Sequence, residues 1–483
     1  MDDTHAMTQD TQAATGRAAQ ATSTTAKAHH PYSSAELRRR RQALLKALGE
    51  DAVLLVPAAP EVIRNRDVHH PYRQASDLTW LTGFPEPEAV AVFAPKRKDG
   101  AFVLFCRARD PEREVWDGFR YGVEGAVEHF GADQAFPISE LDERLPEILG
   151  DRRRVVYPLG LDDDFDRRVI GWLRAVRALA RKGIGAPSEL VSSDRYLHER
   201  RLIKSKSELK LMRRAAAISA SAHQRLMRTA APGCPEQRLE ATFLAACAEQ
   251  GARFQAYPPI VGSGANACVL HYVENADVLH DGDLVLVDAG CELHGYASDI
   301  TRTFPANGRF SAPQRRLYEL VLAAQQAAIA KVRPGNRWNQ PHKAALKVLT
   351  RGLVELGLIT GEGATDGVAT DLKQLIKDER YKPFFMHKTG HWLGMDVHDV
   401  GQYKQDGRWR RFEPGMVLTV EPGLYIAPDA EAPAEYRGIG IRIEDDVLVT
   451  EGEPEVLSAG VPKDPDAIEA LMAANADARM ALA

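Results

Sequence analysis

The sequence predicts an α/β domain at the N-terminus followed by an α+β domain built from two duplicated αα/β halves. The chain has 483 residues, which exceeds what one hydrophobic core usually serves. In its first part, short apolar runs alternate with helical stretches, as is typical of an α/β domain. In its second part, one order of helices and strands occurs twice. We therefore expect a tail at 1–30, the N-terminal domain at 31–200 and the duplicated domain at 201–483.

The composition restricts the possible partners. Residues 1–30 are rich in Ala, Thr and Gln and lack the basic and apolar regions of a signal peptide, so we interpret them as a disordered tail. The net charge of -5 gives no general attraction to nucleic acid or anionic lipid. No apolar run approaches the roughly 20 residues that a membrane span needs. The five cysteines show no Cys-x-x-Cys spacing, which predicts a reducing, cytoplasmic setting without disulfides or a thiolate zinc site.

The first expected element is a helix through SAELRRRRQALLKAL. Ser33 and Ser34 can cap its start, and four leucines form an apolar stripe. The run from Arg38 to Arg41 is either a basic patch or an ordinary solvated helix face, and the acidic balance of the chain favours the solvated face.

The remaining elements of the N-terminal domain follow in alternation. Short apolar runs predict strands, and the stretches between them predict helices. The expected strands are 52–56, 89–95, 101–105 and 153–158, and the expected helices are 138–149 and 164–181. A longer helix, which starts near 205 behind a serine cap, begins the second domain.

The second domain contains two helix–Pro-Gly–helix–strand units. In the first, helices at about 206–230 and 235–250 precede strands that carry Asp288 and Asp299. In the second, helices at about 312–332 and 340–357 precede strands that carry Glu421 and Glu444. We expect the two sheets to face each other across a pseudo-twofold axis, with a site where they meet.

Three histidines lie close together between these carboxylates. The segment 385–399, FMHKTGHWLGMDVHD, contains His387, His391 and His398 but lacks the His-Glu-x-x-His helix of zinc proteases. Taken alone, the three could be structural histidines with satisfied hydrogen bonds. The carboxylates on both sides of the segment favour a functional site instead.

Four carboxylates occupy strand positions around this segment. Asp288 and Glu421 each end a continuous apolar run, where an unpaired carboxylate would be costly. Asp299 lies in the strand-like stretch ASDITRTF, and Arg442 and Glu444 share one face of GIRIEDD. The alternative is a set of buried ion pairs with arginines as partners, namely Arg302, Arg437 and Arg442.

Carboxylates with few nitrogen ligands and no thiolate favour Mn²⁺ over Zn²⁺. Four carboxylates exceed the charge needs of one ion, so we expect two divalent ions about 3.5–4 Å apart. Zn²⁺ or Co²⁺ in place of Mn²⁺ remains open.

The contexts of these residues resemble a known family. Asp288, Asp299, His391, Glu421 and Glu444, in VDAG, SDITRTF, HWLG, VEPGLY and RIEDD, look like the dinuclear metal site of the pita-bread metallopeptidases. Within them the chain most resembles bacterial aminopeptidase P, the Xaa-Pro aminopeptidases. The likeness runs from about residue 31 to the end and includes PYRQASDLTWLTGFPEPEAV, FVLFCRARD, VGSGANACVLHY and EYRGIGIRIEDD.

The resemblance implies a fold, a reaction and a role for each matching residue. All five quoted residues would bind two metal ions, Asp299 and Glu444 as bridges, and a hydroxide between the ions would attack the first peptide carbonyl. Glu421 would also relay the proton. The catalytic histidines would be His271, His387 and His398, which hold the proline side of the peptide and stabilise the oxyanion.

The resemblance also implies residues that contact the substrate. Val397 and Tyr425, with the ring faces of His387 and His398, would form an apolar pocket for the proline ring, and Arg442 would lie beside it. Family members often form dimers or tetramers in which a neighbour's N-terminal domain edges the active site, and Trp116 matches a residue of that wall. Lys388 departs from the family, whose members usually carry small or neutral residues there.

Of the competing interpretations only prolidase stays open, because this chain keeps the full ligand set and has a large N-terminal domain. Prolidase shares the fold and the ligands but cleaves Xaa-Pro dipeptides. Creatine amidinohydrolases and non-enzymatic binding modules share the fold without the full ligand set. Methionine aminopeptidases lack an N-terminal domain of this size.

Overall fold

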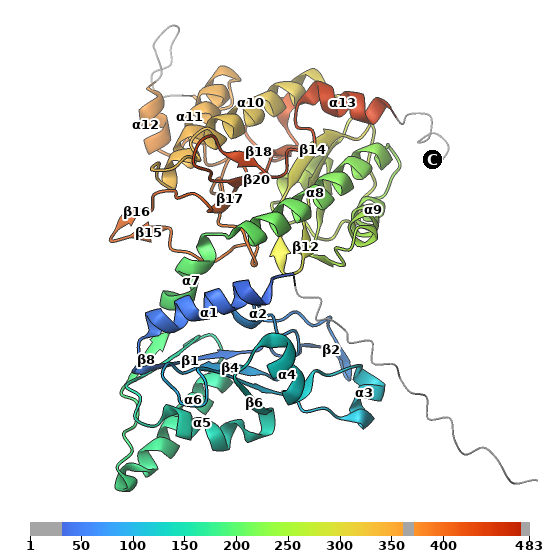
Figure 1. The fold of residues 1–483 in the computed structure, drawn as a ribbon. Helices are drawn as coiled ribbons and strands as arrows, with labels where there is room; N and C mark the ends of the chain where they lie inside the picture. Colours follow the sequence, from blue (N-terminus) through green and yellow to red (C-terminus); the bar gives the residue numbers. More distant parts are fainter. Residues whose placement is uncertain (1–30, 361–370, 475–483) are drawn as a thin grey trace, which may run out of the picture.

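A computed structural model describes residues 31–360 and 371–474 of the chain. They form two domains stacked on each other, with helix α1 (Ser34–Leu48) lying between the N-terminal sheet and the C-terminal domain (Figure 1). The tail predicted at 1–30 lies outside the described residues. The boundary expected between 200 and 201 stays a prediction and falls within α7 (Asp194–Leu202).

The N-terminal domain is built on a six-stranded mixed sheet with the order β6-β5-β4-β1-β7-β8. Its strands are β1 (Ala52–Pro57), β4 (Val90–Phe93), β5 (Phe102–Cys106), β6 (Gln134–Pro137), β7 (Arg154–Tyr157) and β8 (Glu189–Ser192). Side chains of β1 alternate between the two faces, as strand geometry requires. Leu54 and Val56 pack with α1, α2 (Ser76–Thr82) and α4 (Gly122–Phe130), whereas Val53 and Leu55 pack with α5 (Leu141–Leu149) and α6 (Asp163–Ala178).

The prediction of a fully solvated arginine run in α1 is wrong for two of its four members. Arg40 and Arg41 are only 6% and 7% exposed, whereas Arg38 and Arg39 face solvent. The Arg40 guanidinium lies over the rings of Tyr32 and Trp80 and pairs with Glu36 and Glu208. Sequence spacing cannot show this burial, because two of these partners, Trp80 and Glu208, come from distant segments.

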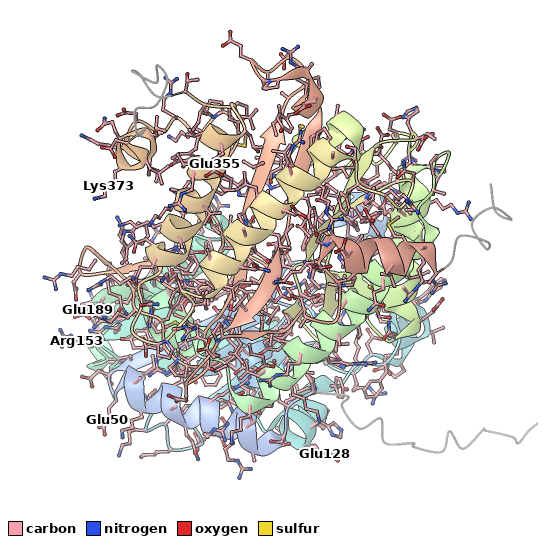
Figure 2. All side chains as sticks on the ribbon, turned by 90° about the horizontal axis from the view of Figure 1, so that it is seen from above. Glu50, Glu128, Arg153, Glu189, Glu355 and Lys373 are labelled. Carbon is pink, nitrogen blue, oxygen red and sulfur yellow. The ribbon has the colours of Figure 1, made fainter. Side chains whose placement is uncertain are left out.

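The helices of the second domain follow the predicted duplication. The first pair is α8 (Lys206–Thr229) and α9 (Glu236–Glu249), and the second pair is α10 (Ala312–Ile329) and α11 (Asn339–Glu355). Seen from above, α10 and α11 run side by side, with Glu355 at the end of α11 (Figure 2). Shorter helices, α12 (Leu372–Lys377) and α13 (Pro465–Ala473), complete the outer layer.

The strands of the two halves meet in the middle of this domain. In the first half, β11 (Leu284–Asp288) pairs antiparallel with β10 (Ile260–Ser263) and β14 (Thr301–Pro305). In the second half, β17 (Val417–Val420) pairs with β20 (Asp445–Leu448), and β18 (Gly423–Ile426) pairs with β19 (Ile439–Arg442). The Glu444 amide donates to the Thr301 carbonyl at 3.1 Å, and the Thr303 hydroxyl donates to the Arg442 carbonyl at 3.0 Å. These bonds join the two halves.

The remaining strands are short. They are β2 (Ile63–Asn65) and β3 (Val68–His69) in the N-terminal domain, and β9 (Phe254–Gln255), β12 (Cys291–Leu293), β13 (Tyr296–Ala297), β15 (Lys404–Gln405), β16 (Arg408–Trp409) and β21 (Glu455–Val456) in the C-terminal domain. Among the described residues, no helix is both long and apolar enough to span a bilayer.

Candidate metal centre and catalytic cavity

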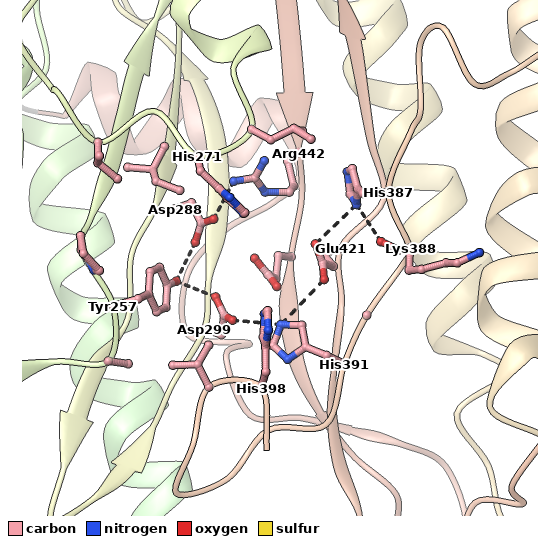
Figure 3. A pocket seen from close by; sticks show the side chains of 18 residues that line it. Tyr257, His271, Asp288, Asp299, His387, Lys388, His391, His398, Glu421 and Arg442 are labelled. Atoms are coloured by element: carbon pink, nitrogen blue, oxygen red, sulfur yellow. Dashed lines mark hydrogen bonds and ion pairs between the residues drawn. The ribbon is translucent and has the colours of Figure 1, made fainter. Parts of the chain in front are cut away.

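A cavity of about 780 Å³ opens where the two halves of the C-terminal domain meet (Figure 3). All four predicted carboxylates line it, each at or beside the end of a strand. Asp288 is the last residue of β11, and Glu421 directly follows β17. Asp299 and Glu444 lie outside regular strands, just before β14 and in the break between β19 and β20, rather than within strands as expected. Strand ends from both halves therefore supply the carboxylates.

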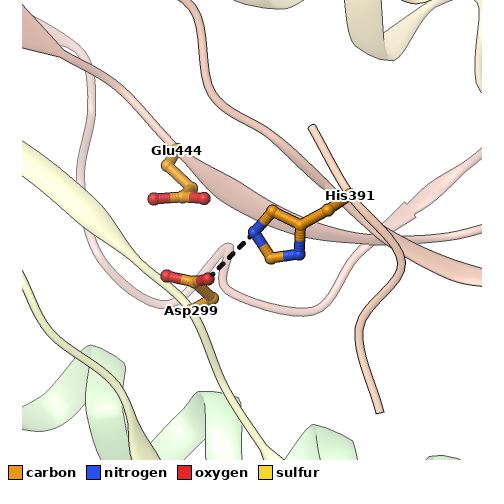
Figure 4. A group of neighbouring side chains, drawn as sticks. All are labelled: Asp299, His391 and Glu444. Atoms are coloured by element: carbon orange, nitrogen blue, oxygen red, sulfur yellow. Dashed lines mark ion pairs between the residues drawn. The ribbon is translucent and has the colours of Figure 1, made fainter. Parts of the chain in front are cut away.

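Three of the predicted metal ligands form a compact group. One ligand atom from each of Asp299, His391 and Glu444 lies within 4.8 Å of the others (Figure 4). Nε2 of His391 is 3.3 Å from Asp299 and 3.8 Å from Glu421. Such spacing allows a divalent ion to contact all of them after small side-chain movements.

The orientation of His391 fits metal binding. Its Nδ1 lies 3.0 Å from the Trp392 carbonyl, which can only accept, so Nδ1 carries the hydrogen and Nε2 faces the carboxylates. Burial alone would lower the pKa of His391, but Asp299 and Glu421 raise it to about 9. A proton thus occupies the Nε2 position that an ion would take.

The carboxylates also fit a site for cations. Burial raises the pKa of Glu421 to about 7, and Asp299 and Asp288 act in the same direction, against His391 and Arg442. Burial, together with Asp299 and Glu421, raises the pKa of Glu444 well above its ordinary value. Buried carboxylates at such spacing repel one another, and divalent cations relieve this repulsion.

The ion-pair alternative holds for one of the four carboxylates. Nη2 of Arg442 donates to Asp288 at 2.6 Å, whereas Arg302 pairs with Asp445 and Arg437 donates to a backbone carbonyl. Burial still raises the pKa of Asp288, and Asp299 adds to this effect, although Arg442 opposes it.

Tyr257 belongs to the site, and the sequence did not reveal it. Its hydroxyl lies 2.6 Å from Asp288 and 2.5 Å from Asp299, so it ties the two carboxylates of the first half together. Burial and the two carboxylates raise the pKa of Tyr257 well above 10, which keeps the hydroxyl a donor. Tyr257 stands in a loop before Pro258 and Pro259, and no motif in the sequence marks it as part of a site.

The predicted histidines all line the cavity, but their surroundings differ. Nδ1 of His387 donates to the Lys388 carbonyl at 2.7 Å, so its Nε2, 2.9 Å from the Tyr425 hydroxyl, accepts. Burial and Arg442 lower the pKa of His387 to about 4. His398 packs its ring 4.1 Å from that of His391, and burial and His391 lower its pKa. His271 lines the cavity as well.

Two of the predicted substrate-binding residues do not line the cavity. Val397 and Arg442 do, but Tyr425 is 2% exposed and lies behind His387 and Arg442, whose Nη1 donates to its hydroxyl at 3.0 Å. Trp116 lies on α3 (Pro111–Asp117) in the N-terminal domain and is 85% exposed. Lys388 lines the cavity with its ammonium group directed away from the carboxylates (Figure 3).

Comparisons with known proteins agree with this architecture. Residues 210–451 match the model of metallopeptidase family M24, and residues 37–157 match the model of the aminopeptidase P N-terminal domain. The chain is 46% identical to the Xaa-Pro aminopeptidase of Escherichia coli (strain K12), over 91% of this chain and 98% of that protein. It is 42% identical to the Xaa-Pro aminopeptidase of Haemophilus influenzae, over 90% of this chain and 97% of that protein.

Solved structures give the same result. The aminopeptidase PepP of Pseudomonas aeruginosa matches with a TM-score of 0.89 and 53% identity, over 92% of this chain and 99% of that chain. Zinc-substituted aminopeptidase P of Escherichia coli in complex with product matches with a TM-score of 0.88 and 46% identity, over the same shares. The expected pita-bread fold with an N-terminal α/β domain is confirmed. This chain belongs to metallopeptidase family M24 and, within that family, to the aminopeptidase P proteins.

Proposed function

We propose that this chain releases the N-terminal residue from peptides that carry proline in second position. The main observation is the cavity, in which the predicted ligands Asp288, Asp299, His391, Glu421 and Glu444 face one another beside three histidines. The relatives named Xaa-Pro aminopeptidase, matched over nearly their whole length, support the same activity. We assign the protein to the cytoplasm, since its cysteines are free and none follows a disulfide pattern.

We further propose two divalent ions in this site, with Mn²⁺ as the preferred metal because carboxylates dominate the ligand set. When bound, they would supply a water nucleophile at neutral pH and polarise the scissile carbonyl. Asp299 and Glu444 lie centrally and would hold both ions. Tyr257 and Arg442 would fix the carboxylates of Asp288 and Asp299 through the hydrogen bonds described above.

Glu421 would move the proton. A general acid–base group acts best when its pKa is near the working pH, and a carboxyl group with a pKa of about 7 meets this condition. The hydrogen-bond donor that stabilises the oxyanion must be a side chain other than Glu421. His387 already uses its N–H for the Lys388 carbonyl and its lone pair for Tyr425, so we assign this role to His271 or His398.

Three peptides that differ at the second residue or at the α-amine test the proposed function. We expect Arg-Pro-Pro to be cleaved once, at its first bond, because the α-amine is held at the metals and the proline ring is recognised by shape. Arg-Ala-Ala and N-acetylated Arg-Pro-Pro should be poor substrates. Product analysis and kcat/KM values for the three peptides measure this, and efficient cleavage of Arg-Ala-Ala would contradict the proline pocket. Rates on Xaa-Pro dipeptides that exceed those on Xaa-Pro-Yaa tripeptides would instead identify a prolidase.

Lys388 gives a second, smaller prediction. Its exposed ammonium group should favour peptides with an acidic residue after proline, by at most about fivefold, since exposed charge pairs contribute about 1 kcal/mol or less. We expect Lys388→Gly to lower the kcat/KM ratio of Xaa-Pro-Asp to Xaa-Pro-Ala at low salt and to change it little at high salt. Lys382→Gly, at an exposed lysine paired with Glu379 outside the cavity, serves as the matched control. Equal ratios in the wild type and in Lys388→Gly would place Lys388 on the solvated surface.

We also propose that the protein assembles as a homo-oligomer, a dimer or a tetramer. The β2–β3 hairpin and α3 expose apolar side chains in the N-terminal domain, among them Ile63, Val68, Val115 and Trp116. Figure 1 places β2 and α3 on the same side of that domain. Exposed apolar groups on one side of a domain favour association with another chain, and Trp116 would then edge the cavity of a neighbouring copy.

A further inference from the structure

The motif PYRQASD at residues 71–77 belongs to the N-terminal domain but contacts the wall of the catalytic cavity. Nη2 of Arg73 donates to the Met395 carbonyl at 2.6 Å, and the Ser76 hydroxyl donates to Asp396 at 2.6 Å. Both acceptors lie in residues 394–399, which we call the recognition loop, and its residues Val397 and His398 line the cavity. The N-terminal domain therefore holds a segment that faces the substrate.

Arg201 strengthens this link between the domains. Its guanidinium, with the side chain only 4% exposed, donates through Nη2 to Asp396 at 2.6 Å and to Asp399 at 2.7 Å. Its Nη1 donates to Asp77 of the N-terminal domain at 2.8 Å. One buried cation thus joins a carboxylate of the N-terminal domain to two carboxylates of the recognition loop.

Asp399, the second carboxylate of the recognition loop that binds Arg201, is closed to solvent. The Asp399 side chain is 1% exposed and accepts a further bond from Nζ of Lys204 at 2.8 Å. Gly394 leaves room for this pair, since a Cβ there would lie 2.1 Å from Oδ2 of Asp399. Asp396 and Asp399 flank Val397 and His398, so the network fixes both ends of the pair that lines the cavity.

We propose that the N-terminal domain sets substrate recognition within its own chain, by holding the recognition loop through Ser76, Asp77 and Arg201. These three are positioning residues, because they act on the substrate only through Val397 and His398. The kinetic part of this inference rests on the proposed function. The structural part, the order of the recognition loop, can be measured without substrate.

The test uses Ser76→Ala and Asp77→Asn in the full chain. Both variants keep the Arg201–Asp399 pair and weaken the link to the N-terminal domain. We expect amide hydrogen exchange within residues 394–399 to accelerate about tenfold, because Ser76→Ala removes a hydrogen bond to the Asp396 carboxylate and Asp77→Asn removes the charge that pairs with Arg201. For Arg-Pro-Pro, KM should rise about tenfold while kcat changes less, and the preference for proline over alanine in second position should fall.

Arg213→Ala serves as the control, since it removes a half-exposed ion pair with Glu455 in the C-terminal domain, which also carries the recognition loop. It should leave exchange in the recognition loop and all kinetic constants unchanged. A lower Tm in Ser76→Ala and Asp77→Asn with unchanged exchange, KM and proline preference would assign the network a purely structural role and overturn the proposal. If the wild type does not cleave Xaa-Pro peptides, the proposed function fails, and the exchange measurement still decides whether the network holds the loop.

Discussion

Glu421→Gln is expected to lower kcat at least about 100-fold, the usual loss when a general acid–base group is removed. The amide keeps the shape of the side chain but can neither relay a proton nor bind a cation as a carboxylate does. Burial and the neighbouring carboxylates raise the pKa of Glu421 to about 7, which suits it to exchange protons near neutral pH. Steady-state kinetics with Arg-Pro-Pro at saturating Mn²⁺ measures the effect.

A matched control is available on the same domain. Glu435 is half-exposed and pairs with Arg316 at the surface, so Glu435→Gln should keep wild-type activity. If Glu421→Gln retains more than about a tenth of the wild-type kcat, Glu421 is not the proton relay. Metal content must be measured in the same samples, because a loss of metal would lower the rate for a different reason.

Glu421→Gln should also make the metal-free protein more stable at high pH than the metal-free wild type. In the metal-free fold the pKa of Glu421 lies above its ordinary value, so the folded state favours the protonated carboxyl. That stability is fully present below about pH 4.5 and is lost as the pH rises through about 7. The neutral amide of Glu421→Gln avoids this loss, which amounts to about 3 kcal/mol at pH 8. The free energy of unfolding of the chelated wild type and of chelated Glu421→Gln should be measured at pH 5 and pH 8. The variant should be the more stable at pH 8, and the two should differ little at pH 5.

Much of this site could be predicted from local sequence, because strand ends and helix periodicity are local properties. Apolar runs that end in Asp288 and Glu421 indicated buried carboxylates, and the duplicated order of elements indicated two halves that meet. The spacing in GIRIEDD placed Arg442 on the side of Glu444, where it pairs with Asp288. Helix bounds agreed closely for the same reason: the predicted 206–230 is α8 (Lys206–Thr229).

What the sequence did not reveal depends on contacts between distant segments. Tyr257 becomes part of the site only because β11 and the segment before β14 bring two carboxylates to its hydroxyl. Arg201 stands in a polar stretch that looks like a solvated linker, yet its three carboxylate partners are 124, 195 and 198 residues away. Tyr425 follows the site motif closely in sequence, but the pairing of β18 with β19 turns it behind His387.

Removing the divalent ions is expected to abolish peptide cleavage and to destabilise the protein at neutral pH. The cavity would then hold four carboxylates and one close arginine, and burial and mutual repulsion raise the pKa values of Asp288, Glu421 and Glu444. Protonation relieves this repulsion, so the chelated protein should lose stability as the pH rises, whereas the metal-loaded protein should not. Activity assays and thermal unfolding after dialysis against a chelator measure both effects.

Reconstitution then identifies the metal and its number. Adding Mn²⁺ to the chelated protein should restore cleavage of Arg-Pro-Pro, with activity and Tm rising together to saturation at two ions per chain, because a carboxylate-rich site prefers this ion. Co²⁺ and Zn²⁺ are the comparisons, since His391 also suits them. Saturation at one ion would leave the dinuclear site without support. Full activity in protein that elemental analysis finds free of metal would refute the metal centre itself.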